Sequence, residues 1–413
     1  MYGLLLGVRI VEGASFIAGP YCSLLLSQLG AEIIRFDAIG GSPDYRRWPL
    51  GPGGDSFYWE GLNKGKKSVA LNLAMAEGRE LAIAIVTTGG KDSGIFVTNY
   101  PESGFLSHDS LSKLRPDLVT AHVLGHADGT SAVDYTVNCG VGLPYMTGPQ
   151  GTNRVPINHV LPAWDLLAGS TAAVSVLAAI EYRRRTGLGQ LIRIPLSDVA
   201  AATLGNLGQI AEVAISGTDR PKYGNNLFGA FGRDFGCADG KRVMIVAITS
   251  KQWRAAIAAL DLQSAISALE AELGMSLDSD EGARFLHRDR INAMVEQVVA
   301  RYTLAALSQR LTSSGACFGV YRTVHEALTE DPSFVEANPI FAHVHHPSGC
   351  KYPTPGFPAS FSGAARRDPS PAPVLGGDTE EVLTTLLRIP SAALASLHDR
   401  GVVRLADRPL SPR

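Results

Sequence analysis

The sequence predicts an α/β fold in which a large, Rossmann-like domain with a parallel sheet is joined to a smaller α+β domain. Three observations lead to this prediction. Short β-branched runs alternate with helical segments over the first 200 residues, a cluster of Gly, Pro and charged residues interrupts the chain at 217–225, and the alternation is lost after that break. Strand–helix–strand alternation is typical of a parallel sheet covered by helices. We therefore expect a large domain over 1–216 and a small domain over 225–340.

The large domain is predicted to contain six strands and four helices. Runs rich in Val, Ile and Leu predict strands at 8–12, 32–37, 67–72, 95–99, 118–123 and 191–196. Helical patterns lie between them, near 20–29, 75–88, 165–185 and 197–215. The 165–185 segment is strongly apolar, but it contains Ser170 and Thr171 and ends in three arginines. The apolar helix predicted from Leu166 to Ile180 is too short to cross a bilayer, so we expect a buried core helix.

The small domain begins with a hairpin signal. FGRDFGCADGKRVMIVAI predicts two antiparallel strands joined by the turn Ala238-Asp239-Gly240. Helices are then expected at 250–260, 279–300 and 303–313, followed by a short strand at 317–321. From about 340 the chain is rich in Pro and Gly, which predicts a connection along the surface. A last helix at 379–387 is expected to pack back on the large domain, which would then include 346–413.

Composition excludes several classes of function. The chain has 413 residues, 45% of them hydrophobic and 18% charged, as in ordinary soluble proteins. Its formal net charge of -2 offers no basic surface for a nucleic acid. The apolar run in MYGLLLGVRIVEG is too short for a signal peptide, so no membrane partner is expected. Widely spaced cysteines without a CxxC pair favour a reducing cytoplasm over a zinc or disulfide framework; they are Cys22, Cys139, Cys237, Cys317 and Cys350.

Three local patterns favour structural roles over ligand sites. The loop between Gly13 and Gly19, with Asp37 ending the next strand, is reminiscent of a dinucleotide site, but the GxGxxG pattern is missing. Lys64, Lys66 and Lys67 precede a strand; phosphate binding is the alternative to a solvated strand entrance, which is favoured. HVHH at 343–346 has no carboxylate or cysteine at ligand spacing, so no metal is expected.

Asp165, in NHVLPAWDLLAG, is the candidate for covalent chemistry. The chain has no GxSxG elbow, Walker motif or HExxH, so a covalent mechanism would need a carboxylate or thiol in an unmarked setting. From neighbouring residues alone, Asp165 is better explained as a cap at the start of the apolar helix. Helix N–H groups would also keep the carboxylate ionised, which suits a nucleophile. Both roles stay open at this level.

Several longer stretches, in a fixed order, carry a family resemblance. They are GVRIVEGASFIAGPYCSLLLSQLGAEIIRFD, LNKGKKSVALN, VTNYP, the aspartate before the long helix, RRRTGLGQLIRIPLSDV, GACFGVYRTVHEAL and GGDTEEVL. With them the chain resembles CoA-transferase family III, which includes formyl-CoA transferase and α-methylacyl-CoA racemase, nearly from end to end. The resemblance implies an acyl-CoA substrate, no cofactor beyond the CoA moiety of that substrate, and a homodimer of interlocked chains.

The resemblance also assigns residues. Asp165 matches the aspartate that forms an acyl anhydride and then an aspartyl-CoA thioester in this family. CoA contacts are implied, by position, for Ile17, Leu71, Asn99 and Tyr100. The family's racemase pairs its aspartate with a histidine, and this chain has Val133 there, so racemisation lacks its second base.

Further stretches resemble one branch of the family, whose members move CoA between the two carboxylates of one mesaconate molecule. The stretches are DYRRWP, VDYTVN, GLPYMTGP, NHVLPAWD and GNNLFGAFGRDF. Arg47, Tyr135 and Asn226 are predicted from their polarity to hold the free carboxylate. A bulky Asn225–Phe228 segment replaces a mobile glycine-rich loop, which fits an enzyme that never releases its acid. The alternatives are an intermolecular transferase using a separate free acid, and a CoA-binding scaffold without activity.

Overall fold

The computed structural model describes residues 1–152 and 155–406, which form two compact units. Among these described residues, the first unit consists of 1–141, 160–211 and 332–406, and the second of 142–152, 155–159 and 212–331. Segment 142–159, placed in the large domain by the sequence analysis, thus packs with the second unit. The proposed boundaries of independently folding domains stay a prediction.

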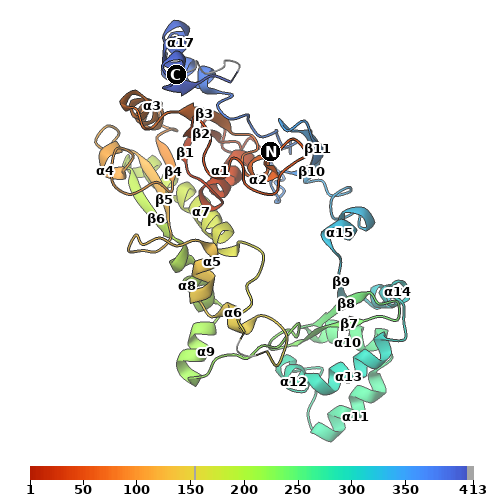
Figure 1. Ribbon diagram of the computed structural model, residues 1–413. Coiled ribbons are helices and arrows are strands. Elements are labelled where there is room, and N and C mark those ends of the chain that lie inside the picture. The colour runs from red at the N-terminus through yellow and green to blue at the C-terminus, as the bar shows by residue number, and fades with distance from the viewer. Residues whose placement is uncertain (153–154, 407–413) are drawn as a thin grey trace. The chain divides into compact units, whose positions relative to one another are not determined.

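The first unit is organised around a seven-stranded sheet in the order β12-β3-β2-β1-β4-β5-β6 (Figure 1). Six strands are parallel and agree with the six predicted runs: β1 (Arg9–Gly13), β2 (Glu32–Ala38), β3 (Lys67–Leu71), β4 (Ile95–Thr98), β5 (Val119–Leu124) and β6 (Gln190–Pro195). β12 (Val403–Arg404), which was not predicted, runs antiparallel to β3. The predicted parallel sheet is therefore confirmed. Its strand order reverses between β1 and β4, the place where ligands bind in open α/β sheets.

The helices of the first unit agree with the predictions at three of four places. These are α1 (Ala18–Gln28), α3 (Ala76–Thr87) and α7 (Ala163–Thr186). The helix predicted at 197–215 is wrong as a single element, because Gly208 adopts φ 77° and separates α8 (Leu196–Asn206) from α9 (Gln209–Ser216). Several short helices of this unit were not predicted, namely α2 (Phe57–Leu62), α4 (His108–Leu111), α5 (Asp134–Gly140) and α17 (Ser391–Asp399). The short helix α6 (Leu143–Met146), also not predicted, belongs to the second unit.

Helix α7 is long and apolar enough to cross a membrane by length and composition alone. It nevertheless packs along α1, and Ala168, Ala172 and Val176 are fully buried. The approach is close at Gly169, where a Cβ would lie 2.7 Å from the carbonyl oxygen of Ala18. The prediction of a buried core helix is confirmed, and the contact with α1 sets the position of the first turn of α7.

The C-terminal part of the chain packs on the first unit. The Asp378 carboxylate and the Thr379 hydroxyl, at the start of α16 (Thr379–Thr385), accept hydrogen bonds from the N–H groups of Ser68 and Ala70, at 2.8 and 3.1 Å. The Pro-rich segment before it, expected to be only a connection, holds a hairpin of β10 (Phe341–His345) and β11 (Lys351–Pro355). Strand β11 was not predicted because it contains Pro353 and Pro355, and a proline has no backbone N–H to donate to the neighbouring strand.

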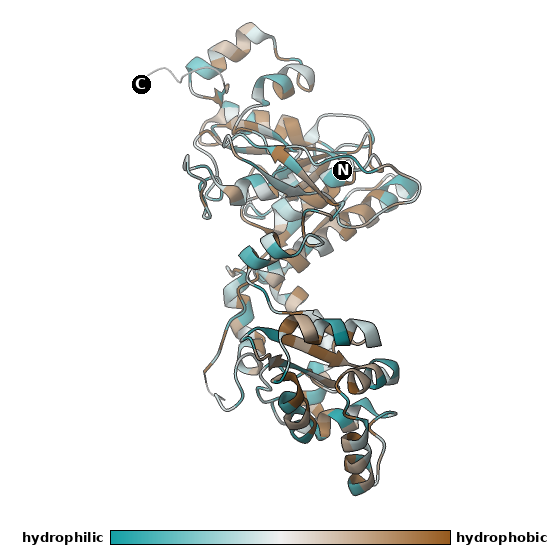
Figure 2. Cartoon of the chain, turned by 90° about the vertical axis from the view of Figure 1, so that its right-hand side faces the viewer, coloured by the Kyte–Doolittle hydropathy of each residue, from teal (hydrophilic) through white to brown (hydrophobic). Residues whose placement is uncertain are grey.

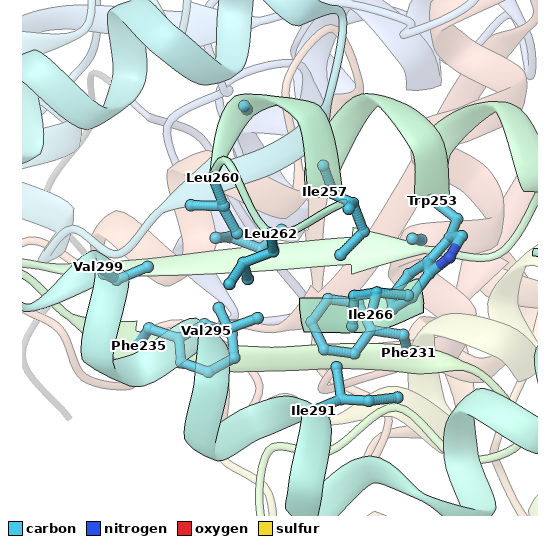
Figure 3. Packing of buried hydrophobic residues seen from close by; sticks show 14 of the residues in the cluster. Phe231, Phe235, Trp253, Ile257, Leu260, Leu262, Ile266, Ile291, Val295 and Val299 are labelled. Atoms are coloured by element: carbon cyan, nitrogen blue, oxygen red, sulfur yellow. The ribbon is translucent and has the colours of Figure 1, made fainter. Parts of the chain in front are cut away.

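The second unit is an antiparallel sheet, β7-β8-β9, covered by helices. β7 (Phe231–Gly236) and β8 (Arg242–Ala247) form the predicted hairpin, in which Cys237 N–H donates to Lys241 at 2.8 Å. Its helices are α10 (Ser250–Ala259), α11 (Gln263–Leu273), α12 (Glu281–Leu286), α13 (Arg288–Val299), α14 (Leu304–Ser314) and α15 (Val324–Glu330), and its third strand is β9 (Cys317–Val320). The single helix predicted at 279–300 is therefore two. Phe231, Phe235 and Trp253 pack with aliphatic side chains in its core (Figure 3).

The strands of both units are rich in hydrophobic residues, which Figure 2 draws in brown, and many of these residues are buried. The alternation of side chains along β2 has a consequence for the site. Ile34 and Phe36 point into the apolar core with α3, whereas Arg35 and Asp37 point to the other face of the sheet. The charged side chains of Arg35 and Asp37 thus lie buried inside the first unit, near the carboxyl end of β2.

Candidate active site

A cleft of about 1080 Å³ lies at the carboxyl ends of the parallel strands and is lined by residues of the first unit alone. Its walls are the loops after β1 and β4, the end of β5, the 125–135 segment and the first turn of α7. The position is the one expected for a ligand site, because the strand order reverses between β1 and β4. Within residues 1–152 and 155–406, no group of three or more His, Cys, Asp or Glu side chains is arranged to hold a metal ion.

The loop after β1 is held in an unusual conformation at the edge of the cleft. Phe16 has φ 71°, a left-handed value that costs energy for a residue with a large side chain. Its N–H donates to the Asp44 carboxylate at 3.1 Å. Next to it, the Asn99 amide accepts from Ser15 N–H at 3.2 Å and donates to Ser15 C=O at 3.1 Å. The two bonds between Ser15 and Asn99 join the loops that follow β1 and β4, and the bond from Phe16 to Asp44 joins the first of these loops to the segment after β2.

A buried ion-pair network supports this loop from below. The Arg35 guanidinium donates to Glu12, Asp37 and Asp44 at distances between 2.8 and 3.1 Å. Lys66 donates to Glu12 at 2.7 Å. All five side chains are at most 5% exposed. The interpretation of Lys66 as part of a solvated strand entrance is therefore wrong, because the chain folds over it and pairs it with Glu12.

The first turn of α7 is capped from another helix. Asp165 is the third residue of α7, and the residue at the N-cap position is Pro162, which forms no side-chain cap. The Asp134 carboxylate, at the start of α5, accepts from the N–H groups of Trp164 at 2.7 Å and of Asp165 at 3.1 Å. The prediction that Asp165 itself caps the helix is thus wrong. Its side chain is instead part of the cleft wall.

The charge state of Asp165 also differs from the prediction. Burial and, to a smaller extent, the nearby Asp134 carboxylate raise its pKa to about 7, and Arg47 opposes the change. The helix N–H groups that were expected to keep Asp165 ionised are occupied by Asp134. No donor among residues 1–152 and 155–406 makes a hydrogen bond to the Asp165 carboxylate within the structure. A carboxylate in this state is a stronger base and nucleophile than an exposed one.

Arg47 and Tyr58 form a polar corner of the cleft. The Arg47 guanidinium carbon lies 5.6 Å from the ring centroid of Phe16 and 5.5 Å from that of Tyr58. The Tyr58 hydroxyl is buried and has no hydrogen-bond partner in the described part of the chain. Burial raises the pKa of Tyr58, so its hydroxyl stays a neutral donor. A cation and an unused O–H donor at one corner suit a carboxylate.

Glu102 and His122 contribute a second polar group to the cleft wall. Glu102 follows β4, and His122 Nδ1, on β5, lies 3.3 Å from the Glu102 carboxylate. Burial lowers the pKa of His122, so the ring is neutral near pH 7. Arg193 of β6 pairs with the same carboxylate. Neither the motifs nor the resemblance suggested these residues.

Most of the predicted site residues meet at the cleft. Its lining includes Ile17, Arg47, Asn99, Tyr100, Tyr135 and Asp165. Leu71 is not there, because its side chain is fully buried in the core next to β12. Asn226 belongs to the second unit, where it accepts from Asn292 at 2.9 Å and donates to Tyr223 C=O at 2.8 Å. Its role stays a prediction.

The sequence analysis missed Asp134 and Tyr58. Asp134 lies next to Tyr135 in VDYTVN, but a single acid before a short helix carries no signal of its own. Tyr58 belongs to α2, and it matters for the site because its buried hydroxyl has no hydrogen-bond partner among the described residues. Neither property can be read from spacing along the chain.

The chain is similar, over most of its length, to a known protein family and to individual proteins. A model of CoA-transferase family III matches residues 5–379. The chain is 46% identical to 2-methylfumaryl-CoA isomerase of Chloroflexus aurantiacus, over 99% of this chain and 100% of the relative. It is 26% identical to succinyl-CoA:glutarate CoA-transferase of Mus musculus, over 96% of this chain and 89% of the relative.

A solved structure shares the fold. The crystal structure of a CAIB/BAIF family protein from Brucella suis matches with a TM-score of 0.75 and 23% identity, over 92% of this chain and 99% of that one. The family match and the structural similarity both span most of the chain, so the family assignment does not depend on a single motif. The chain belongs to CoA-transferase family III.

Proposed function

We propose that this protein moves CoA within one substrate molecule, converting mesaconyl-C1-CoA (2-methylfumaryl-CoA) to mesaconyl-C4-CoA (3-methylfumaryl-CoA). One observation of the structure carries the proposal: Asp165 lines the cleft with a carboxylate that no described donor engages and whose pKa is raised to about 7. The 46% identity with 2-methylfumaryl-CoA isomerase over nearly the whole chain supports the choice of substrate.

The chemistry exchanges one activated acyl bond for another in four steps. The Asp165 carboxylate attacks the C1 thioester carbonyl, forming a mixed anhydride and releasing CoA thiolate. The thiolate attacks the aspartyl carbonyl, which gives an aspartyl-CoA thioester and free mesaconate. The C4 carboxylate of that mesaconate then attacks the aspartyl thioester and again releases the thiolate. Attack of the thiolate on the C4 carbonyl of this second anhydride yields the product and restores Asp165.

Retention of the diacid is the demand on the site. Between the second and third steps, mesaconate is not covalently bound and must turn its other carboxylate toward Asp165. We assign the idle carboxylate to Arg47, with the Tyr58 hydroxyl as a second donor, because both lie in one corner of the Asp165 cleft. Holding the reacting groups close replaces an encounter in solution by a step within the complex.

The CoA moiety is assigned to the same cleft. Ile17, Asn99 and Tyr100 lie on the loops after β1 and β4, where parallel sheets bind their ligands. Leu71 is left out of this assignment, because the whole residue is buried and its strand is paired with β2 on one side and β12 on the other. Tyr135 shares the cleft, although its hydroxyl already donates to Val160 C=O at 3.3 Å. No cofactor beyond the CoA moiety of the substrate enters this scheme.

We further propose an interlocked homodimer that acts in the cytoplasm. The family resemblance implies this assembly, and large apolar side chains left exposed on a single chain support a partner surface. Val174 is 67% exposed, Leu207 69% and Ile215 88%. Light scattering of the purified protein should give twice the mass of one chain, and a monomer would contradict the assembly.

The decisive experiment supplies mesaconyl-C1-CoA alone and follows products by chromatography. We expect conversion to the C4 isomer without any added acid, and no conversion would refute the proposal. Isotope-labelled free mesaconate is then added. Label entering the CoA ester at the catalytic rate would favour the alternative, an intermolecular transferase like the relative that acts on succinyl-CoA and glutarate.

A matched pair of variants tests the nucleophile. Asp165→Asn should reduce turnover by at least about 10⁴-fold, because the amide cannot form the anhydride. Asp198→Asn is the control: Asp198 is the third residue of α8, as Asp165 is of α7, but it does not line the cleft. Turnover that survives in Asp165→Asn would leave a CoA-binding scaffold or another nucleophile.

A further inference from the structure

We infer that Asp134 is a positioning residue: it holds the first turn of α7 from outside the helix, and so leaves the Asp165 carboxylate clear of internal hydrogen bonds and available to the substrate. The inference rests on the proposed role of Asp165 as nucleophile. It gives a role to a residue that lies in the VDYTVN stretch but to which neither the motifs nor the family resemblance assigned one.

The geometry of the cap carries the inference. Helix N-termini leave N–H groups without partners inside the helix, and a residue at the N-cap commonly supplies the acceptor. Proline occupies that position in α7 and offers no side-chain acceptor. Asp134 Oδ2 accepts from two successive N–H groups, those of Trp164 and Asp165, at 2.7 and 3.1 Å.

Helix α5 grips this turn at a second point. Asn138, one turn after Asp134, accepts from the Trp164 indole at 3.1 Å, and both Trp164 and Asn138 are buried. The two bonds fix the backbone and the side chain of Trp164, the residue just before Asp165. Helix α5 therefore fixes the direction in which the Asp165 side chain points away from α7.

The second oxygen of Asp134 makes the arrangement costly, which argues for a function. Asp134 is 2% exposed, and its Oδ1 has no hydrogen-bond partner among the residues described. A buried polar atom without a partner destabilises the folded state. A serine or threonine would cap with no such orphan atom. The carboxylate brings something that a hydroxyl would not, namely a negative charge beside Asp165.

That charge acts on Asp165 together with two other groups. Asp165 is faced by Asp134 from α5, by Arg47 from the loop after β2 and by the neutral Tyr58 of α2. After burial, Asp134 is the larger influence and raises the pKa of Asp165. The dipole of α7 favours an anion at this end of the helix. Asp134 thus occupies the N–H groups and makes Asp165 more basic.

The test separates the two effects with two variants. Asp134→Asn keeps an oxygen that can accept from the two N–H groups but removes the charge, whereas Asp134→Ala removes both. The protonated-carboxyl infrared band of the enzyme without substrate is titrated with pH, and the contribution of Asp165 is identified by its loss in Asp165→Asn. Hydrogen–deuterium exchange of the peptide covering 160–166 reports on the cap.

We expect the Asp165 band to titrate near pH 7 in the wild type and about 1 pH unit lower in Asp134→Asn. The ratio of kcat/KM for Asp134→Asn to that of the wild type should then rise as pH falls from 8 to 6. Exchange at 160–166 should stay near the wild-type rate in Asp134→Asn and accelerate in Asp134→Ala. A purely structural role for Asp134 would not move the titration.

An unchanged Asp165 titration in Asp134→Asn would overturn the action of its charge, and unchanged exchange in Asp134→Ala would overturn the cap. Both readouts are independent of turnover. Retention of turnover by Asp165→Asn would instead contradict the proposed nucleophile, so the two failures are distinguishable. Asp198→Asn, at the equivalent position of α8, should match the wild type in all three measurements.

Discussion

Two groups of charged side chains lie in the first unit, one buried beneath the cleft and one in the cleft wall, and they differ in their hydrogen-bond partners. In the network beneath the cleft, Arg35 contacts three carboxylates, and Lys66 shares one of them. In the cleft wall, Asp165 accepts no hydrogen bond from the described residues and its neighbour Asp134 is another acid. The first group is saturated with partners, and the second lacks them. Saturated charges hold a structure, whereas unsaturated ones are available to a substrate.

The effect on proton binding follows the same division. Burial would lower the pKa of Arg35, but Asp37 and Glu12 outweigh it and raise that pKa. For Asp165, burial and Asp134 act together, so its pKa rises to about 7. Asp44 connects the two groups, because its carboxylate accepts both from Arg35 and from Phe16 N–H at the edge of the cleft. The saturated network thus sets the shape of the loop that the reactive carboxylate faces.

The largest effect is expected from breaking the saturated network. Arg35→Met should lower the free energy of unfolding by about 3–5 kcal/mol, because it leaves buried carboxylates without their cation. Denaturant unfolding measures the loss. Arg184→Met is the control, since the Arg184 side chain is 56% exposed and its pair with Asp92 is worth at most about 1 kcal/mol. Equal losses of unfolding free energy in the two variants would show that the buried Arg35 network stabilises the fold no more than the exposed Arg184–Asp92 pair does.

Arg47 is the cation of the unsaturated group. Arg47→Gln should reduce kcat/KM about 100-fold, or about 2.7 kcal/mol, since a charge-assisted contact with the substrate carboxylate is lost. Initial rates with mesaconyl-C1-CoA check this. Arg46→Gln, which alters the neighbouring exposed arginine outside the cleft, should stay close to the wild type. A similar loss in both would point to a general effect of loop charge.

Asp165 should cost the protein stability at high pH. Its pKa in the folded state lies near 7, above the ordinary 3.8, so the folded state binds more protons than the unfolded state between these values. The contribution of this group to stability therefore falls as pH rises through that window. Asp165→Asn should raise the free energy of unfolding by about 2 kcal/mol at pH 8, with the gain disappearing below pH 4.

Denaturant unfolding at both pH values measures this gain. Asp198→Asn is again the matched control, because Asp198 occupies the same position in α8 and is exposed. A pH-independent gain in Asp165→Asn would mean that the carboxylate is not strained by burial.

The smallest effect concerns the orphan hydroxyl. Tyr58→Phe should lower kcat about 10-fold, or about 1.4 kcal/mol, by removing one neutral donor while the ring stays over Arg47. Thermal stability should not fall, because the hydroxyl has no partner to lose in the described structure. A drop in stability with unchanged kcat would show that the hydroxyl serves the fold.

The parts of the site that could be predicted are those that depend on neighbours along the chain. The six parallel strands agree with their β-branched runs, and the turn Ala238-Asp239-Gly240 was recognisable from its residues. The break in α8–α9 was missed because one glycine in a helical pattern is often tolerated. Placing Asp165 in the first turn of α7 was correct, but its capping role was not.

The sequence by itself determined the alternation of strands and helices, the family, and the position of Asp165 at the start of a core helix. These depend on periodicity, turn residues and matched stretches, which are local. Only the tertiary structure decided that Asp134 takes the helix N–H groups, that Lys66 is buried against Glu12, and that Leu71 lies outside the cleft. Such facts depend on which distant segments meet and how much water they exclude, and both follow from packing across the whole unit.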